Sequence, residues 1–430
     1  MTKNLLVALL TLASGAARAQ AAEPQPAATP PAETSPAQPS EAPPAPTEAA
    51  PTETAATPSI EERLTTDEGK VAALEEQNIE TKSDLSLLKK LKISGYVQSR
   101  YQYQQPDEDE ANPGVHLNDG FSRFTVRRGR IKTTYNGDMG LLMLQVDIIP
   151  TAVALRDAEA TLYIPGTKQN LSVTLGQMKL PFGYEAPQSS SDREFPERTR
   201  VVGAYLPGER DRGLRFNGKF GVMRVAAGFF DGNGISNSNF FGVDNDKEKD
   251  FVGRLGFDLK WISGGVSGWK GTTLGKRTTG PNPDAFRTAY DRDRVGADLQ
   301  VYLDLLPLGG TALKGEFIGG TAYQRNNVEQ LGIAGHGYYA LLVQNIGIHD
   351  ILALRYEYFD GQNGLDAIES GSRLGTNNAI GTLGIAAIHN FGETIELTAA
   401  YELSMTETVN GGTAKDPSDN LFTLQLQARY

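Results

Sequence analysis

Cysteine is absent from the 430 residues of this chain. Its absence excludes disulfide scaffolds, thiolate metal sites, cysteine nucleophiles and an acylated lipoprotein anchor. Histidine is scarce, and the four histidines at positions 116, 336, 349 and 389 lie far apart and match no metal-ligand spacing. The sequence therefore predicts no metal site and no cofactor.

Long apolar runs are also missing. Mean hydropathy is −0.36, and no run of about 20 apolar residues follows the first two dozen positions, which excludes ordinary transmembrane helices. At the start, Lys3, an apolar run at 5–13 and a small-x-small sequence at 17–19 predict a cleaved signal peptide over residues 1–19. A signal anchor is the alternative, but the apolar run is too short to cross a bilayer. We therefore expect the mature chain outside the cytoplasm.

Residues 20–58 lack the apolar side chains that a folded core needs. Eleven of the 23 prolines lie here among Ala, Thr and Glu, without any Lys or Arg. Such a segment cannot bury enough surface to fold. We expect a disordered, Pro- and Ala-rich tether with extended backbone.

Residues 59–91 have a helix-forming composition. Ser59 followed by Glu62 fits a capping box, and a series with seven-residue spacing runs through Leu64 and Val71. This imperfect heptad pattern predicts a short coiled coil that joins copies of the chain. An amphipathic helix that lies against the following domain is the alternative.

Apolar and polar residues alternate from position 92 to position 430. In the last ten residues, LFTLQLQARY, one face holds Phe, Leu, Leu, Ala and Tyr, and the other holds Thr, Gln, Gln and Arg. Roughly sixteen such runs occur, with lengths near the 9 to 11 residues of a strand that crosses a bilayer at a tilt. The strands are expected near 93–104, 121–135, 139–149, 157–165, 170–178, 212–219, 222–231, 250–259, 262–270, 291–304, 311–322, 335–346, 350–360, 377–389, 393–404 and 419–430.

The connections between these strands alternate in length. Short turns such as 136–138 and 390–392 alternate with long loops such as 105–120 and 179–211, as in outer-membrane barrels. A soluble sandwich or barrel would need a packed apolar interior, and sixteen strands enclose too much space for that. The sequence therefore predicts an all-β fold, a 16-stranded antiparallel transmembrane β-barrel over residues 92–430 with a wet, charged lumen.

Four arginines occur within eight residues, RFTVRRGR. The alternation changes phase near Gly129, most simply through a β-bulge, so that Arg127 and Arg128 can both face the lumen. They form either a basic rail for anions or a structural ion-pair network with acids of neighbouring strands, such as Asp157 and Glu159; the two roles can coexist. Binding to nucleic acid is not expected, because the exported chain is acidic, with a net charge of −11.

Seven short motifs are spaced along the predicted barrel. They are GYVQSRY (95–101), FTVRRGRIK (124–132), LRDAEATLYI (155–164), LGQMKLPFGYE (175–185), FPERTR (195–200), GERDRGLRFNGKF (208–220) and RYEYFDGQNG (355–364). In this order they resemble the phosphate-selective porin O and P family of bacteria. The resemblance implies a trimeric outer-membrane channel whose third long loop, here 179–211, folds inward to narrow the pore. It also implies that Tyr430, where the family usually has Phe, is a recognition signal for the barrel-assembly machinery.

Parity along the strands assigns the candidate pore-lining side chains. They are Arg100, Arg123, Arg127, Arg128, Arg130, Lys132, Asp157, Glu159, Arg215, Arg254, Arg294 and Arg355. The candidate constriction residues of the long loop are Lys179, Glu185, Arg193, Arg198 and Arg200. Inward bases outnumber inward acids, so the assignment predicts a modest preference for anions.

The sequence thus predicts a channel for passive diffusion of small hydrophilic solutes, with phosphate as one candidate. We expect a homotrimer in contact with outer-membrane lipid. A structural tether or adhesin that uses the N-terminal extension or the long loops is one alternative. An enzyme barrel is another, but neither G-x-S-x-G nor a Ser/His/Asp grouping is found in the sequence.

The predicted coiled coil can be tested in isolation. A peptide that covers residues 59–91 is expected to assemble into trimers, because its apolar positions need partner helices. Sedimentation equilibrium at increasing concentration measures the assembly. A peptide that stays monomeric at high concentration would rule out the coiled coil.

Overall fold

The computed structural model describes most of the chain after residue 59. The described residues are 60–108, 116–118, 120–206, 208–232, 234–235, 247–276, 287–321, 334–361, 366–369, 372–377, 379–406, 408–410, 413–415 and 420–430. The signal peptide expected at 1–19 and the tether expected at 20–58 lie outside the described residues.

An α-helix, α2, spans Ile60–Lys90. Leu64, Val71 and Leu74, which belong to its two heptad series, are more than half exposed in the single chain. The coiled coil remains a prediction, because it requires further copies of the chain. None of the described helices combines the length and the apolar composition needed to cross a membrane.

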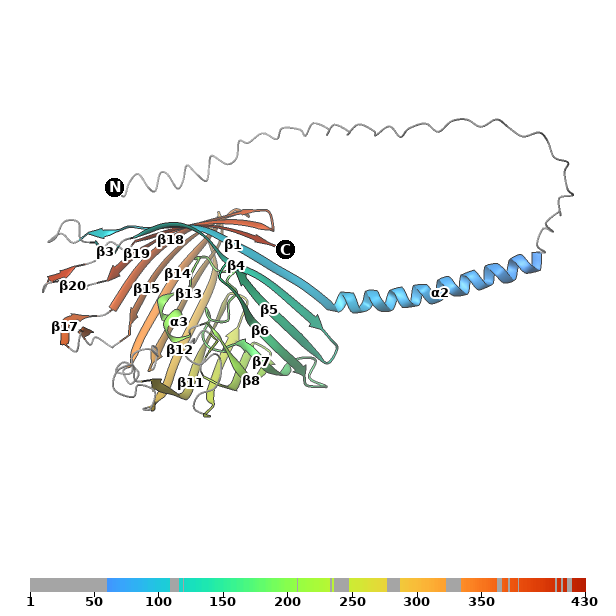
Figure 1. The fold of residues 1–430 in the computed structure, drawn as a ribbon, viewed down its shortest axis with the longest axis horizontal. Helices are drawn as coiled ribbons and strands as arrows, with labels where there is room; N and C mark the ends of the chain where they lie inside the picture. The colour runs from blue at the N-terminus through green and yellow to red at the C-terminus, as the bar shows by residue number, and fades with distance from the viewer. Residues whose placement is uncertain are drawn as a thin grey trace, which may run out of the picture. The chain divides into compact units, whose positions relative to one another are not determined.

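Sixteen strands of the described residues form one closed antiparallel barrel (Figure 1). They are β1 (Leu91–Gln104), β4 (Phe121–Asn136), β5 (Gly140–Ile149), β6 (Ala152–Tyr163), β7 (Leu171–Lys179), β8 (Arg210–Phe220), β9 (Met223–Phe230), β10 (Asp250–Asp258), β11 (Ile262–Lys276), β12 (Arg287–Leu306), β13 (Gly309–Gly320), β14 (Gly335–Ile346), β15 (Asp350–Asp360), β18 (Ala379–Phe391), β19 (Ile395–Thr406) and β22 (Leu421–Arg429). The predicted barrel is therefore confirmed, with a strand at every predicted position.

The remaining elements lie in the long connections. Short strands pair as β2 (Asp107–Glu108) with β3 (His116–Asn118), β16 (Asp366–Glu369) with β17 (Ser372–Asn377), and β20 (Thr408–Asn410) with β21 (Thr413–Lys415). A short helix, α3, spans Arg200–Tyr205 between β7 and β8.

The barrel closes where β1 pairs with β22. Tyr96 lies opposite Arg429, and the ladder continues to Gln104 opposite Leu421. Tyr430 extends the ladder by one step, because its N–H and carbonyl each exchange a 3.1 Å hydrogen bond with Gly95. Its role as an assembly signal remains a prediction.

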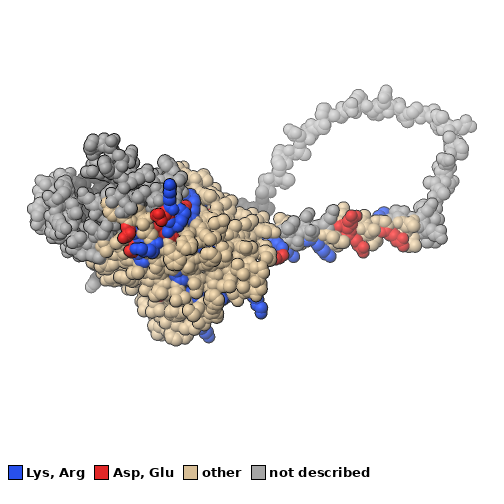
Figure 2. Space-filling view, turned by 90° about the horizontal axis from the view of Figure 1, so that it is seen from below, with Lys and Arg blue, Asp and Glu red and all other residues tan. Residues whose placement is uncertain are grey.

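On strands such as β22, the alternation places polar side chains inside and apolar side chains outside. On β22, Gln425 and Gln427 are at most 4% exposed, whereas Leu424 and Leu426 are 37% and 49% exposed. A soluble barrel would show the opposite distribution. Figure 2 agrees, because most of the visible barrel surface is drawn in tan, with one group of charged side chains and a few isolated Lys or Arg side chains.

Two predicted boundaries differ from the structure in an informative way. The hairpin of β11 and β12 continues to the pair Lys276 and Arg287, although 271–290 was predicted as a loop. Gly and Thr residues there form the backbone hydrogen bonds of the hairpin without alternation of apolar and polar side chains. The sequence pattern therefore does not indicate this extension of the two strands. Strand β6 also begins earlier than predicted, because Arg156 is an extra residue in a bulge opposite β5.

The connection from β7 to β8, residues 180–209, crosses the lumen. In the ring of sixteen described strands, β15 lies eight places from β7. Arg200 N nevertheless donates to Glu357 Oε2 of β15 at 3.2 Å, and Gly183 N donates to Ser267 Oγ of β11 at 2.9 Å. The structure thus shows the inward fold that the family resemblance implied for this loop.

An apolar cluster inside the barrel holds this loop against the wall. Among the described residues, the loop contributes Leu180, Phe182, Ala186, Phe195, Val201, Val202, Tyr205 and Leu206, and the wall contributes residues such as Trp269, Ile318, Tyr339, Leu341 and Val343. The sequence predicted a wet, charged lumen, and this cluster adds an apolar part to it. Apolar inward side chains of β11, β13 and β14 have a partner once the loop covers them.

Glycines of the wall make room for the loop's aromatic side chains. A Cβ atom added to Gly384 would lie 2.7 Å from Phe195 Cε1, and one added to Gly296 would lie 2.8 Å from Phe182 Cε1. Such separations are too short for non-bonded carbon atoms. Only glycine therefore permits these two rings to pack directly on the strand backbone.

Substituting Gly384 or Gly296 by Val should displace the loop and widen the pore. Overpacking of this kind costs about 1–3 kcal/mol, so we expect folded barrels with a higher single-channel conductance. Gly268→Val is the matched control, because a Cβ atom there meets nothing within 4 Å. Unchanged conductance in folded Gly384→Val and Gly296→Val would show that these contacts do not position the loop.

Candidate functional site

Three arginines of the wall converge on one acid of the inward loop. Arg100 Nη1 and Arg127 Nε lie 2.9 and 2.7 Å from Glu197 Oε1, and Arg128 Nη2 lies 3.2 Å from Glu197 Oε2. Arg100 comes from β1, and the other two come from β4. We call Arg100, Arg127 and Arg128 the arginine triad.

A bulge allows two successive arginines to reach the same carboxylate. Gln98 of β1 pairs with Arg128 and Ser99 pairs with Val126, so Arg127 is the extra residue. The predicted register change therefore occurs, two residues before Gly129. It turns both side chains toward the lumen, as expected.

The triad keeps a net positive charge after pairing. Arg100 and Arg128 are only 2% and 5% exposed in their side chains, whereas Arg127 and Glu197 are 40% and 37% exposed. Burial alone would raise the pKa of Glu197, but the charges of Arg128, Arg127 and Arg100 lower this pKa far below its ordinary value. Three arginines and one ionised acid give the triad together with Glu197 a charge of +2.

The predicted ion-pair network exists, but with other partners for Arg127 and Arg128. Asp157, one of the expected acids, binds Arg210 Nε at 2.7 Å. Glu159, the other, lies 3.9 Å from Arg215 Nη2. Bases of β8 therefore occupy both acids, and the two arginines turn to the loop instead.

Three more of the predicted pore-lining bases pair with acids of the wall. Arg130 pairs with Asp147 at 3.2 Å, and Arg254 pairs with Asp298 at 2.6 Å. Arg355 pairs with Glu402 at 2.5 Å. Asp147 also lies 3.3 Å from Arg156, so Arg130, Arg156 and Asp147 together keep a positive charge, smaller than that of the triad.

Three further bases of the predicted set have other environments. Arg123 donates weakly to Gln102 at 3.5 Å and stacks on Phe121. Arg294 donates to the Tyr205 carbonyl and stacks on Trp269, so it ties α3 to the wall. Lys132 lies opposite Gln145 in the ladder.

The predicted constriction residues mostly fasten the loop rather than line an opening. Lys179 Nζ donates to the carbonyls of Pro187 and Gln188 at 2.8 and 3.1 Å. Glu185 accepts from the backbone and hydroxyl of Thr199. Arg200 is 42% exposed in its side chain, yet it also reaches the wall, because it donates to Thr382 Oγ1 and Ser404 Oγ at 3.3 Å.

Arg193 and Arg198 are both buried in the loop but differ in their partners. Arg198 donates to the carbonyls of Glu185, Ala186 and Gln188 and to Glu209. Arg193 is 7% exposed, and none of its guanidinium nitrogens has a hydrogen-bond partner among the described residues. Burial, together with the charges of Arg198 and Arg128, lowers the pKa of Arg193 to about 9.

Sequence reasoning missed the acid at the centre of the site. Glu197 lies within FPERTR, which carried the family resemblance, yet parity rules do not apply in a loop. Phe182 and Phe195, which anchor the loop, were also missed. Their only signal in the sequence was an aromatic residue beside proline in a long polar connection.

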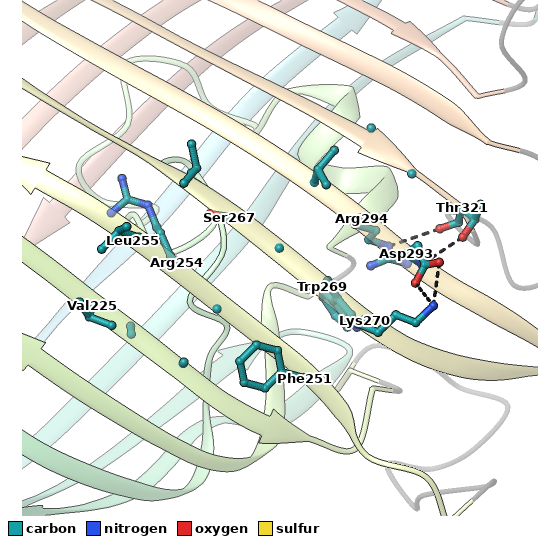
Figure 3. A pocket seen from close by; sticks show the side chains of 18 residues that line it. Val225, Phe251, Arg254, Leu255, Ser267, Trp269, Lys270, Asp293, Arg294 and Thr321 are labelled. Carbon is teal, nitrogen blue, oxygen red and sulfur yellow. Dashed lines mark hydrogen bonds and ion pairs between the residues drawn. The ribbon is translucent and has the colours of Figure 1, made fainter.

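A groove of about 870 Å³ on the barrel wall is separate from this site. Its rim includes outward apolar residues such as Phe251, Leu255 and Val295, which are 45% to 61% exposed. Figure 3 shows Lys270 directed toward Asp293 at its edge, where the two form an exposed ion pair of 2.8 Å. Its lining also includes Arg254 and Arg294 but no member of the triad.

The different partners of Arg193 and Arg198 predict opposite effects of substitution. Arg193→Met should leave the unfolding midpoint unchanged or raise it, because it removes a buried charge without a partner. Arg198→Met should lower stability by about 3–5 kcal/mol, because it breaks a satisfied buried network. Urea unfolding of the two variants, monitored by the heat-modifiable gel mobility of the barrel, measures the difference between them. Equal losses would show that Arg193 has a partner of its own.

Solved porins have the same fold at low sequence identity. The trimer form of the outer-membrane protein OmpT of Vibrio cholerae is 11% identical, with a TM-score of 0.51 over 79% of this chain and 99% of that one. The anion-selective porin of Comamonas acidovorans is 12% identical, with a TM-score of 0.53 over 79% and 99%. The channel DcaP of Acinetobacter baumannii is 12% identical, with a TM-score of 0.52 over 79% and 97%. Identities this low establish the fold alone.

The motif resemblance has independent support in one segment. No curated protein matches the sequence significantly. A family model described as phosphate-selective porin O and P matches residues 148–280, which include β6 to β11 and the inward loop. Over residues 148–280 the chain therefore carries the sequence pattern of the phosphate-selective porin O and P family, on a barrel with the porin fold.

Proposed function

We propose that the protein is an outer-membrane diffusion channel for small hydrophilic solutes with a modest preference for anions, phosphate among them. The arginine triad is the observation that carries the anion preference. The triad pairs with Glu197 of the loop that crosses the lumen, so we expect permeating ions to come within reach of its charge of +2. Fixed charge acts over a Debye length of about 10 Å at 0.1 M salt.

The location and assembly belong to the same proposal. The barrel fold and the family match over 148–280 favour the bacterial outer membrane, with lipid against the apolar outer faces. The trimer form of OmpT supports a homotrimer for this chain. Export by a signal peptide at 1–19 and insertion by the barrel-assembly machinery, with Tyr430 as its signal, complete the proposal.

The alternative functions have weaker support. An enzyme barrel would need a compact catalytic group, and the inward residues described above are occupied by ion pairs and loop contacts. A tether or adhesin would use the N-terminal extension or the long loops. Neither role would explain a charged, partly exposed triad inside the barrel. Absence of conductance in the purified protein would favour the tether.

Arg127→Gln tests the anion preference with little risk to the fold, because Arg127 is the most exposed member of the triad. It reduces the local charge from +2 to +1, so the anion preference should fall by roughly half and weaken further with salt. Reversal potentials in a KCl gradient across planar bilayers measure it. Arg224→Gln is the control, because that base pairs with Asp258 at a short turn.

Cation preference in the unmutated channel would overturn the proposal. Anion preference that survives unchanged in Arg127→Gln would move the selectivity to another part of the lumen. The control should behave as the unmutated protein in both measurements.

A further inference from the structure

The arginine triad holds Glu197 as it would hold a free oxyanion. Both carboxylate oxygens are engaged, one by Arg100 and Arg127 and the other by Arg128, at 2.7 to 3.2 Å. Guanidinium groups offer planar, charged donors that fit two oxygens of one acid or phosphate group. The geometry of the site therefore exists before any solute enters.

The cationic part of this site is fixed in the wall. Arg128 Nη1 donates to Gln98 Oε1 at 3.0 Å, and Arg100 Nη2 donates to Gln425 Oε1 at 3.2 Å. These partners are neutral amides, which orient the guanidinium groups without cancelling their charge. Removing Glu197 from the site would leave the arginines in place.

The carboxylate of Glu197 is the exchangeable part. Its side chain is 37% exposed, so the lumen reaches it. Its backbone is held separately, because Arg355 Nη1 donates to the Glu197 carbonyl at 3.0 Å and the Arg355 guanidinium stacks on Phe195. The side chain can leave the triad by rotation alone while the loop stays anchored.

We propose that Glu197 is an internal ligand of an oxyanion-binding site formed by Arg100, Arg127 and Arg128. Its carboxylate occupies the position of a permeating oxyanion and competes with it. The competition lowers the affinity for oxyanions and lets them leave the constriction, which a conducting pore requires. This proposal rests on the proposed function, and it makes Glu197 a residue that determines the specificity of the channel for oxyanions.

The competition should affect oxyanions more than halides. An oxyanion reproduces the two-oxygen contact of Glu197, whereas chloride offers a single atom. Phosphate and acetate share this chemistry, and they differ in charge and in the number of oxygens. Comparing the two separates phosphate binding from general carboxylate binding.

Glu197→Gln tests the inference in planar bilayers with the full chain. Chloride current is recorded while inorganic phosphate, and separately acetate, is added at constant ionic strength. Glu197→Gln should be blocked by phosphate at a roughly tenfold or more lower concentration than the unmutated channel, because a charge-assisted competitor is gone. Asp258→Asn removes one acid at a short turn and should match the unmutated channel.

If phosphate and acetate both block Glu197→Gln and the unmutated channel equally, the inference is overturned. The reversal potential of the unmutated channel in KCl tests the proposed function separately, so the two failures are distinguishable. A stronger block by acetate alone would identify a carboxylate site, and a stronger block by phosphate would identify a phosphate site. Both support Glu197 as the competitor.

Glu197→Gln leaves three arginines without their acid, and folding is the second measurement. If this variant does not fold in chloride, phosphate at the same ionic strength should restore the heat-modifiable barrel by filling the site. Recovery in phosphate but not in chloride supports an oxyanion site. Failure in both salts, with Asp258→Asn folding normally, would show that Glu197 is purely structural.

Discussion

The closed hydrogen-bonded ladder is the constraint on which the rest of the structure depends. In hydrocarbon each unpaired backbone N–H or C=O costs several kcal/mol. β1 pairs with both β4 and β22, so no barrel strand among the described residues has a free edge. Closure also fixes the direction of every wall side chain, because a register shift of one residue would reverse the two faces. The polar faces enclose the lumen, and the lumen wall supports the inward loop.

The strands were predictable because side-chain direction in a strand is a local property. Residues 421–430 show both faces in ten positions, and the structure has the Gln side chains inside and the Leu side chains outside. The bulge at Arg127 was also predictable, since two segments of opposite parity must meet nearby. Strand ends were less certain. β11 and β12 continue through Thr and Gly residues, whose backbones pair without a pattern in the side chains.

The site was only partly predictable, because its contacts join residues that are far apart in the sequence. Parity placed Arg100, Arg127 and Arg128 in the lumen. It gave no information on Glu197, which is a loop residue 97 positions from Arg100. The path of that loop depends on Phe195 packing beside Gly384 across the barrel. A single sequence does not indicate that a given Phe and a given Gly will be in contact. The acids expected on neighbouring strands were therefore the wrong partners for Arg127 and Arg128.

The kind of partner matters more for selectivity than the number of inward bases. Arg254 pairs with Asp298, and this pair is close to neutral from a distance, whereas Arg130 shares Asp147 with Arg156. Arg100 and Arg128 also use neutral amides, which hold their direction and leave the charge in place. The count of inward bases therefore overstates the positive charge in much of the lumen. Among the groups described above, the largest positive charge lies at the triad. The loop is also anchored by apolar contacts that do not involve these charges, so in our proposal its acid can be exchanged while the loop stays in place.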